Sequence, residues 1–147
     1  MINEPAADHR PFRVLRPLWA MAPAAVSERD RAPEVTVVVP AGATGEPEAQ
    51  LAMTRLAAAG LSMLGLVDLA YATRPPVEIR DDLHRLSAAP VGGVLLDRAP
   101  TSPYGIGPVA LAVRSARRAG LAEVVVNPGL PADPVYACLG AAICTFE

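Results

Sequence analysis

The stretch Val91-Gly-Gly-Val-Leu-Leu-Asp97 decides the fold, because it is apolar until it ends on a carboxylate. A second apolar run, Ile143-Cys-Thr-Phe-Glu147, also ends on an acid. Runs that are apolar throughout are typical of strands covered on both faces. In a sheet of parallel strands, the residues that end the strands meet at the C-terminal edge, where the active sites of α/β folds gather. We therefore expect Asp97 and Glu147 to lie at one edge of such a sheet.

Apolar runs and helical patterns alternate along the rest of the chain. The runs that we expect to be strands cover residues 14–20, 35–39, 63–70, 91–96, 124–126 and 143–146. Three intervals have helical spacing and helix-ending signals, at 46–59, 76–88 and 108–119, and a short helix is expected at Pro134–Leu139 after the N-cap pair Asp133-Pro134. Alternation of strand and helix indicates right-handed βαβ units and a parallel sheet.

The number of strands limits the architecture. A closed (β/α)8 barrel typically needs about 200 residues or more, and this chain has 147. The expected fold class is therefore α/β, a parallel strand–helix repeat that forms an incomplete, TIM-barrel-like (β/α)8 domain with about six strands. A fragment of a barrel and an open doubly wound sheet are the alternatives. We expect a disordered N-terminal tail at 1–11 and a single partial-barrel domain at 12–147.

The composition excludes several classes of function. The net charge is −2, so no basic surplus exists to neutralise phosphates, and we expect no nucleic-acid partner. No apolar run approaches the length of a membrane span, and we expect no membrane partner. No apolar signal-peptide region is visible near the N-terminus. The expected location is the cytoplasm, or outside the cell if a leader has been removed.

The two cysteines do not have the spacing of a metal site. Cys138 and Cys144 lie six residues apart without a nearby histidine, so we expect two buried thiols and no metal. No cofactor is expected either. An open barrel would leave unpaired strand edges, so self-association through the open seam is expected.

An ordered set of short segments carries a resemblance to a known family. The segments are Arg16-Pro-Leu-Trp19, Val37-Val-Val-Pro40, Ala59-Gly-Leu-Ser-Met-Leu-Gly-Leu-Val67 with Tyr71 and Arg74, Val91–Asp97 with Tyr104, Val126-Asn-Pro-Gly129 and Thr145-Phe-Glu147. In this order and spacing they resemble the spherulation-specific family 4 proteins, a glycoside-hydrolase-type barrel family, over nearly the whole chain after residue 12. The resemblance implies cleavage of polymers of α-1,4-linked galactosamine or N-acetylgalactosamine, with Asp97 and Glu147 as the catalytic pair.

The sequence departs from the family pattern at several site positions. The acid that follows the aspartate of the fourth strand is Arg98 here, and the family's Gly-Tyr-Val is Gly65-Leu66-Val67. A threonine of the family is Leu69 here, and an asparagine is Val39. A guanidinium beside a carboxyl favours its ionised form, which is unsuited to a general acid, although Arg98 could point away from Asp97. We therefore expect a carbohydrate site with weak or absent catalysis, and an active endo-glycosidase using Asp97 and Glu147 is the alternative.

Five further residues are candidates for contact with a polysaccharide or oligosaccharide, through aromatic ring faces and hydrogen-bond donors. They are Trp19, Tyr71, Arg74, Tyr104 and Asn127. Three of them also have a plainer interpretation. Trp19 could belong to the core, Arg74 could be a solvated residue before a Pro-Pro turn, and Asn127 could open a turn that redirects the chain.

One motif points to a different function. Gly105-Ile-Gly107-Pro-Val-Ala110 fits the G-x-G-x-x-A pattern of dinucleotide-binding folds. The fingerprint, however, follows a strand directly, and here seven residues separate Asp97 from Gly105. Pro108 also removes a backbone N–H that would bind phosphate. A small nucleotide-binding α/β domain is therefore the second alternative.

Overall fold

The computed structural model describes residues 14–17 and 35–144. The predicted tail at 1–11 and two site candidates, Trp19 and Glu147, lie outside the described residues. The structure contains a single six-stranded sheet in which every strand is parallel to its neighbours and the strands follow chain order. The strands are β1 Val14–Pro17, β2 Val35–Pro40, β3 Ser62–Asp68, β4 Gly93–Asp97, β5 Glu123–Val126 and β6 Ala142–Ile143.

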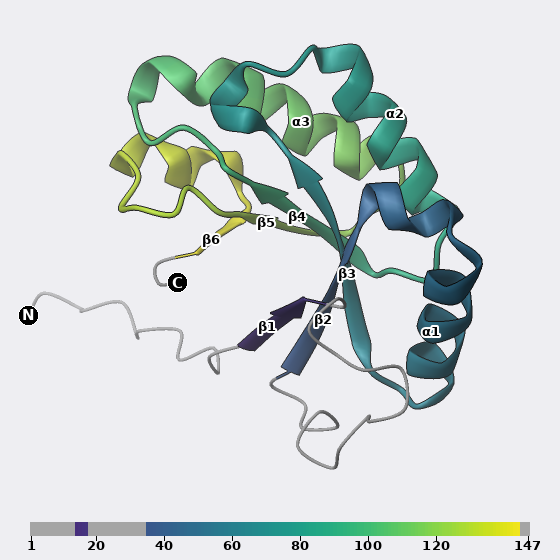
Figure 1. Cartoon of the computed structure of the whole chain (residues 1–147). Coiled ribbons are helices and arrows are strands. Elements are labelled where there is room, and N and C mark those ends of the chain that lie inside the picture. The colour runs from purple at the N-terminus through teal and green to yellow at the C-terminus, as the bar shows by residue number, and fades with distance from the viewer. Residues whose placement is uncertain (1–13, 18–34, 145–147) are drawn as a thin grey trace, which may run out of the picture.

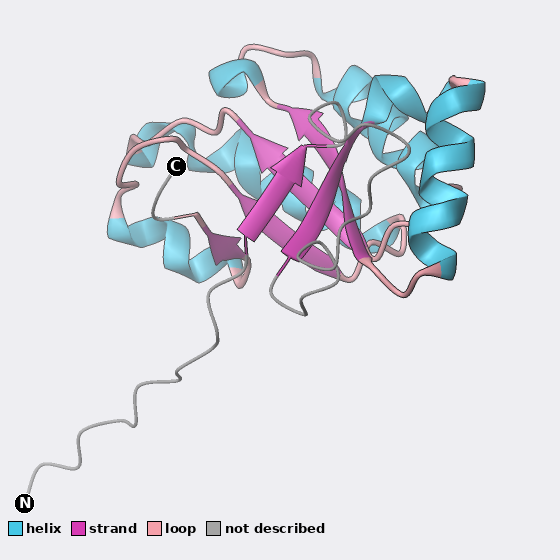
Figure 2. Ribbon diagram, turned by 60° about the horizontal axis from the view of Figure 1, so that its bottom comes forward, coloured by secondary structure: helices cyan, strands magenta, loops and turns pink. Residues whose placement is uncertain are grey.

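Helices connect the strands and lie together on one side of the sheet (Figure 1). The α-helices are α1 Pro47–Ala58, α2 Pro76–Ser87 and α3 Ile106–Arg118, and short 3-10 segments are η3 Ala41–Gly45, η4 Ala70–Ala72, η5 Pro103–Gly105 and η6 Pro134–Leu139. Because each right-handed crossover moves to the next strand in the same direction, it places its helix on the same face. Figure 2 is a view of the sheet from the side without α-helices, so the strands lie in front and the helices lie behind them.

This topology confirms the expected α/β strand–helix repeat with an unclosed, barrel-like sheet. A doubly wound sheet would reverse its strand order and carry helices on both faces, whereas this order runs from β1 to β6 without reversal. The strands β1 and β6 lie at the two ends of that order and are not paired with each other.

The helix-covered face of the sheet forms the main core. Val67, Val94, Leu96 and Val126 pack there with Leu86 and other apolar residues of the helices. The helix layer comes very close at Gly65, where a Cβ would overlap the terminal methyl groups of Leu86. Any larger residue at this point of β3 would force the side chain of Leu86 to move.

Alternate residues of the same strands point to the opposite, inner face. A second buried cluster lies there, made by Val38, Leu64, Leu95 and Val125, with Leu66 and Cys144 packed against it. Gly93 also belongs to this face by alternation, and a Cβ there would collide with the main-chain carbonyl oxygen of Glu123. In a barrel-like fold this face is the interior, and its side chains stack in layers.

Three expectations need correction. The fourth strand begins at Gly93 rather than Val91, because the N–H of Val91 is used in a turn, where it donates to the carbonyl oxygen of Ala89 at 2.8 Å. The third helix begins at Ile106, so Pro108 occupies its first turn, where a backbone N–H has no intrahelical partner to lose. Cys138 is exposed on η6 rather than buried. No described helix has the length and apolar character needed to cross a membrane.

Candidate functional site

Three polar side chains form a row at the C-terminal edge of the sheet. Asp68 and Asp97 end β3 and β4 and face each other in the strand register, and Asn127 directly follows β5. The N–H of Asn127 donates to the carbonyl oxygen of Leu96 at 2.9 Å, which extends the β4–β5 pairing to this level. By alternation with Leu66, Leu95 and Val125, all three belong to the inner face. Asp97 therefore lies at the edge where it was expected, next to an acid, Asp68, that the sequence did not single out.

Asp97 and Asn127, two of the predicted site residues, are in direct contact. The amide Nδ2 of Asn127 donates to Oδ1 of Asp97 at 3.0 Å, and the Oδ1 of Asn127 accepts from the N–H of Gly129 at 3.0 Å. Asn127 is buried, whereas Asp97 is half-buried. The Oδ2 of Asp97 accepts no hydrogen bond from the part of the chain described here. Asn127 therefore orients Asp97 and leaves one carboxylate oxygen available to a ligand.

Arg98 pairs with Asp68. Its Nε donates to Oδ1 of Asp68 at 2.8 Å, and its Nη2 forms an ion pair with Oδ2. The Oδ1 of Asp68 also accepts from the N–H of Ala70 at 2.7 Å. The guanidinium of Arg98 is therefore bound by a carboxylate 30 residues away in the chain. Asp68 ends β3 in the structure, but in the sequence Leu69 and Ala70 continue the apolar run beyond it, so the run itself did not indicate this edge position.

The segment after β3 adopts an uncommon backbone conformation. Ala70, Tyr71 and Ala72 have φ values of 45°, 55° and 68°, and Arg98 has a φ of 50°. Among the described residues, these are the non-glycine positions with a left-handed backbone. Each such position costs about 1–2 kcal/mol relative to a right-handed one. Backbone strain of this kind persists only where surrounding contacts hold it, and it clusters at functional sites.

Contacts across the β3 and β4 ends hold this segment in place. The N–H of Leu69 donates to the carbonyl oxygen of Asp97 at 2.9 Å, and the N–H of Tyr71 donates to that of Arg98 at 2.7 Å. The guanidinium carbon of Arg98 lies 5.9 Å from the centroid of the Tyr71 ring, within the range of a cation–π contact. Tyr71 is 60% exposed, so its ring is accessible at the edge of the site.

Arg74, another predicted site residue, is bound to its own surroundings. Its Nη2 donates to Oδ2 of Asp82 at 2.7 Å, its Nη1 to the carbonyl oxygen of Asp68 at 2.9 Å, and its Nε to Glu78 at 3.3 Å. Partial burial would lower the pKa of Arg74, but the hydrogen bonds and negative charges of Asp82 and Glu78 together outweigh it and raise that pKa. Arg74 thus braces the end of β3 against α2.

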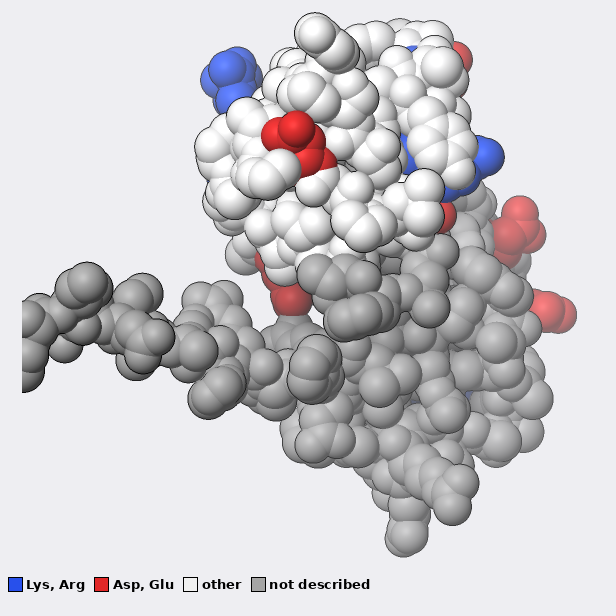
Figure 3. Space-filling model, turned by 90° about the vertical axis from the view of Figure 1, so that its left-hand side faces the viewer, with Lys and Arg blue, Asp and Glu red and all other residues white. Residues whose placement is uncertain are grey.

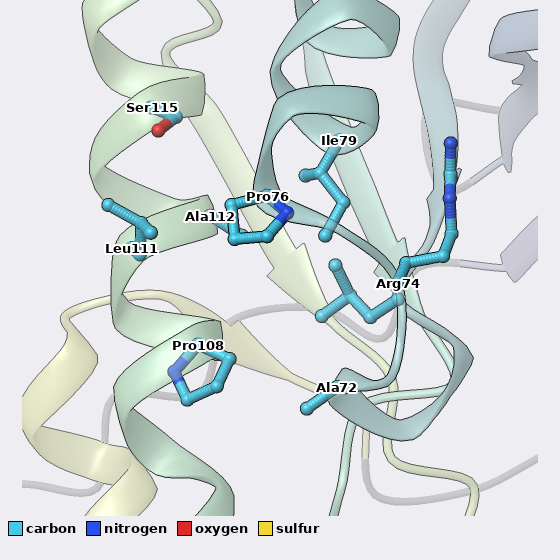
Figure 4. Close-up of a pocket in the computed structure, with 9 residues that line it drawn as sticks. Ala72, Arg74, Pro76, Ile79, Pro108, Leu111, Ala112 and Ser115 are labelled. Atoms are coloured by element: carbon cyan, nitrogen blue, oxygen red, sulfur yellow. The ribbon is translucent and has the colours of Figure 1, made fainter.

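An apolar groove lies between α2 and α3, outside the polar row. Figure 4 shows the guanidinium of Arg74 directed away from this groove, which only its stem lines. The groove is lined by Leu69, Ala72, Arg74, Pro76, Ile79, Pro108, Leu111, Ala112 and Ser115. Such a surface offers few polar groups to recognise a hydroxyl-rich ligand, so the candidate site is the row at the sheet edge.

Tyr104 lies on η5, in the loop between β4 and α3, and is 96% exposed. No described contact joins its ring to the polar row. On the side where this loop and η6 lie, uncharged atoms make up most of the described surface, with a few separate charged side chains (Figure 3). The roles of Tyr104, Trp19 and Glu147 in ligand contact stay predictions.

The first glycine of the dinucleotide-like motif has another explanation. A Cβ at Gly105 would overlap the ring of Pro100 and come within 3.3 Å of the hydroxyl oxygen of Tyr136. That hydroxyl donates to the carbonyl oxygen of Ser102 at 3.0 Å and is part of the packing beneath the loop. Gly105 is therefore required by this packing. Within residues 14–17 and 35–144, no group of three or more His, Cys, Asp or Glu side chains could hold a metal ion.

Comparison with known proteins shows the fold. No protein-family model matches this sequence, and no curated protein does. Among solved structures, the chain is similar to the crystal structure of Aspergillus clavatus Sph3 in complex with GalNAc, with a TM-score of 0.67 and 24% sequence identity. The match covers 77% of this chain and 53% of that one, so the chain spans about half the length of the Sph3 structure.

Proposed function

We propose that this protein binds carbohydrate at the C-terminal edge of its sheet, through a site related to those of glycoside hydrolases and with weak or absent catalysis. The observation that carries the proposal is the inner-face row of Asp68, Asp97 and Asn127, at the edge where barrel-like folds place their ligands. The likeness of the fold to Sph3, whose crystal structure is a complex with GalNAc, supports a sugar as the ligand.

The chemistry of the row suits sugar hydroxyls. The Oδ2 of Asp97, which accepts no hydrogen bond from residues 14–17 and 35–144, can accept from a hydroxyl group, and such a charge-assisted hydrogen bond is stronger than one between neutral groups. Asn127 fixes the carboxylate by its own hydrogen bond, which reduces the entropy lost on binding. Tyr71 offers an exposed ring at the rim, and an aromatic face can pack on the apolar face of a sugar ring.

The same contacts argue against strong catalysis. Glycoside hydrolysis needs one carboxyl that donates a proton and a second that acts as base or nucleophile. In the described residues the second carboxyl at this edge is Asp68, and its oxygens already accept from Arg98 and Ala70. A carboxylate engaged by a guanidinium and a backbone N–H is a weak base and nucleophile. The active alternative requires Glu147, which the structure does not describe.

The test measures binding and cleavage separately. Purified protein is titrated with GalNAc by NMR, and galactosamine-containing polymers are assayed for new reducing ends. We expect saturable GalNAc shifts that Asp97→Ala abolishes, together with little or no cleavage. Robust cleavage that disappears in Asp97→Ala would favour the active endo-glycosidase. The same assay on Arg98→Glu, which introduces an acid next to Asp97, shows whether a second carboxyl at this position increases cleavage. Absence of any GalNAc binding would refute the proposal.

A further inference from the structure

We infer that Arg98 is a positioning residue that holds the Tyr71 ring as a stacking platform for the sugar, and that Asp68 anchors Arg98 for this task. This inference rests on the proposed function, because it assigns a role to residues at the rim of the same site. In the sequence, Arg98 stands out only because the resembling family has an acid at this position. The structure suggests that Arg98 has a role of its own in the site.

The contacts form a continuous chain from the sheet to the ring. Asp68 is fixed by its place at the end of β3, and two nitrogens of Arg98 bind its two carboxylate oxygens. A two-point contact of this kind sets the plane of the guanidinium, which a single-point contact does not. The guanidinium then lies over Tyr71 at 5.9 Å from the ring centroid. One face of the ring is thus occupied, which leaves the other for a ligand.

The backbone supports the same conclusion independently. Tyr71 lies at the centre of three consecutive left-handed residues, and Arg98 is left-handed as well. The two residues are also joined by the hydrogen bond from the Tyr71 N–H to the Arg98 carbonyl oxygen. Two unfavourable backbone conformations that meet at one aromatic side chain point to a functional role for its position, because such strain clusters at functional sites. A platform held in advance binds a sugar more tightly than a mobile ring.

The experiment follows the Tyr71 ring directly by NMR. The chain has three tyrosines, so protein labelled in the tyrosine rings gives a spectrum that Tyr→Phe variants can assign. Arg98→Gln and Asp68→Asn each break the ion pair. Arg80→Gln is the matched control, because Arg80 is an exposed arginine of α2 that has no ion pair with another described residue. Arg98→Lys retains the charge and removes the two-point contact.

In the free protein, we expect Arg98→Gln and Asp68→Asn to shift the Tyr71 ring signals and to leave those of Tyr136 in place. In titrations with GalNAc, we expect both variants to weaken affinity about two- to fivefold, the change that matches the loss of an exposed cation–π contact. We expect Arg98→Lys to restore affinity only in part and Arg80→Gln to have no effect. The affinity of the unmodified protein for this neutral sugar is expected to fall at high salt, because the ion pair is exposed to screening.

The outcomes separate the two proposals. GalNAc binding that Asp97→Ala abolishes but Arg98→Gln leaves unchanged would overturn this inference and leave the proposed function intact. Tyr71 signals that do not move on adding GalNAc to the unmodified protein would overturn it as well. If the unmodified protein does not bind GalNAc at all, the proposed function fails, and the inference fails with it.

Discussion

Replacing Ala70 with glycine tests the left-handed segment beside the site. Ala70 has a φ of 45° and its N–H binds the Asp68 carboxylate, a bond that glycine keeps. Removing the Cβ relieves about 1–2 kcal/mol of left-handed strain. The greater freedom of glycine in the unfolded chain costs about 0.5–1 kcal/mol. We therefore expect Ala70→Gly to raise the free energy of unfolding by about 0.5–1 kcal/mol.

The matched control is the same substitution in a right-handed helix. Ala57 is an exposed residue of α1, and glycine there is expected to cost about 1 kcal/mol. Ala70→Gly should thus raise the free energy of unfolding and Ala57→Gly should lower it, so that the two variants differ from each other by about 1.5–2 kcal/mol. Urea denaturation followed by circular dichroism measures both free energies. A difference of this size also corresponds to several degrees in the melting temperature for a chain of this length.

One result would refute the reasoning. If Ala70→Gly destabilises the protein as much as Ala57→Gly does, Ala70 does not have a left-handed backbone in solution, and the argument from strain is wrong. If Ala70→Gly instead stabilises the protein, we also expect an effect on binding. Ala70→Gly should then loosen the Tyr71 platform and weaken GalNAc binding while it stabilises the fold, a trade typical of strained sites.

Two further predictions concern the core and pH. We expect Gly65→Ala to lower the free energy of unfolding by about 1–3 kcal/mol, because the new Cβ overlaps Leu86, and we expect Leu86→Ala to recover part of that loss in a double-mutant cycle measured by urea denaturation. At Gly93 the new Cβ would meet a backbone oxygen, which cannot move aside, so we expect Gly93→Ala to destabilise the protein more than Gly65→Ala does. A smaller loss at Gly93 than at Gly65 would contradict this packing. Burial and then the charge of Asp133 raise the pKa of Tyr136, so its folded pKa lies above the unfolded value of about 10. The stability linked to this proton is fully present below pH 10 and is lost as pH rises above it, and Tyr136→Phe should flatten that alkaline decline in pH-dependent unfolding curves; an unchanged decline would show that another group causes it.

The sequence was sufficient for the order and type of the main elements. Apolar runs that end on polar residues predicted the parallel strands and the position of Asp97 at the C-terminal edge of the sheet. This succeeded because a strand covered on both faces needs apolar residues throughout, a local property that can be read along the chain. The error of two residues at the start of α3 arose because proline is accepted anywhere in the first turn of a helix.

The partner of Arg98 could not be predicted in the same way. The direction of the Arg98 side chain, toward Asp97 or toward Asp68, depends on the left-handed backbone at Arg98. Residues other than glycine, asparagine and aspartate seldom adopt that backbone conformation. The contact also spans 30 residues and requires the exact register of β3 and β4. The predicted strand continued to residue 70, so Asp68 was placed inside it and its position at the edge was missed.

The strictly sequential strand order has a consequence for how the chain folds. Every strand pair joins positions at most 30 residues apart, from Val14 with Val35 to Gly93 with Glu123. The entropic cost of loop closure rises only slowly with loop length, so it is nearly the same for each strand–helix–strand unit. No single long-range closure has to come first. Folding can begin at whichever unit is locally most favourable and spread to its neighbours, and slow exchange of backbone amides would then mark β3 and β4 as the last units to open.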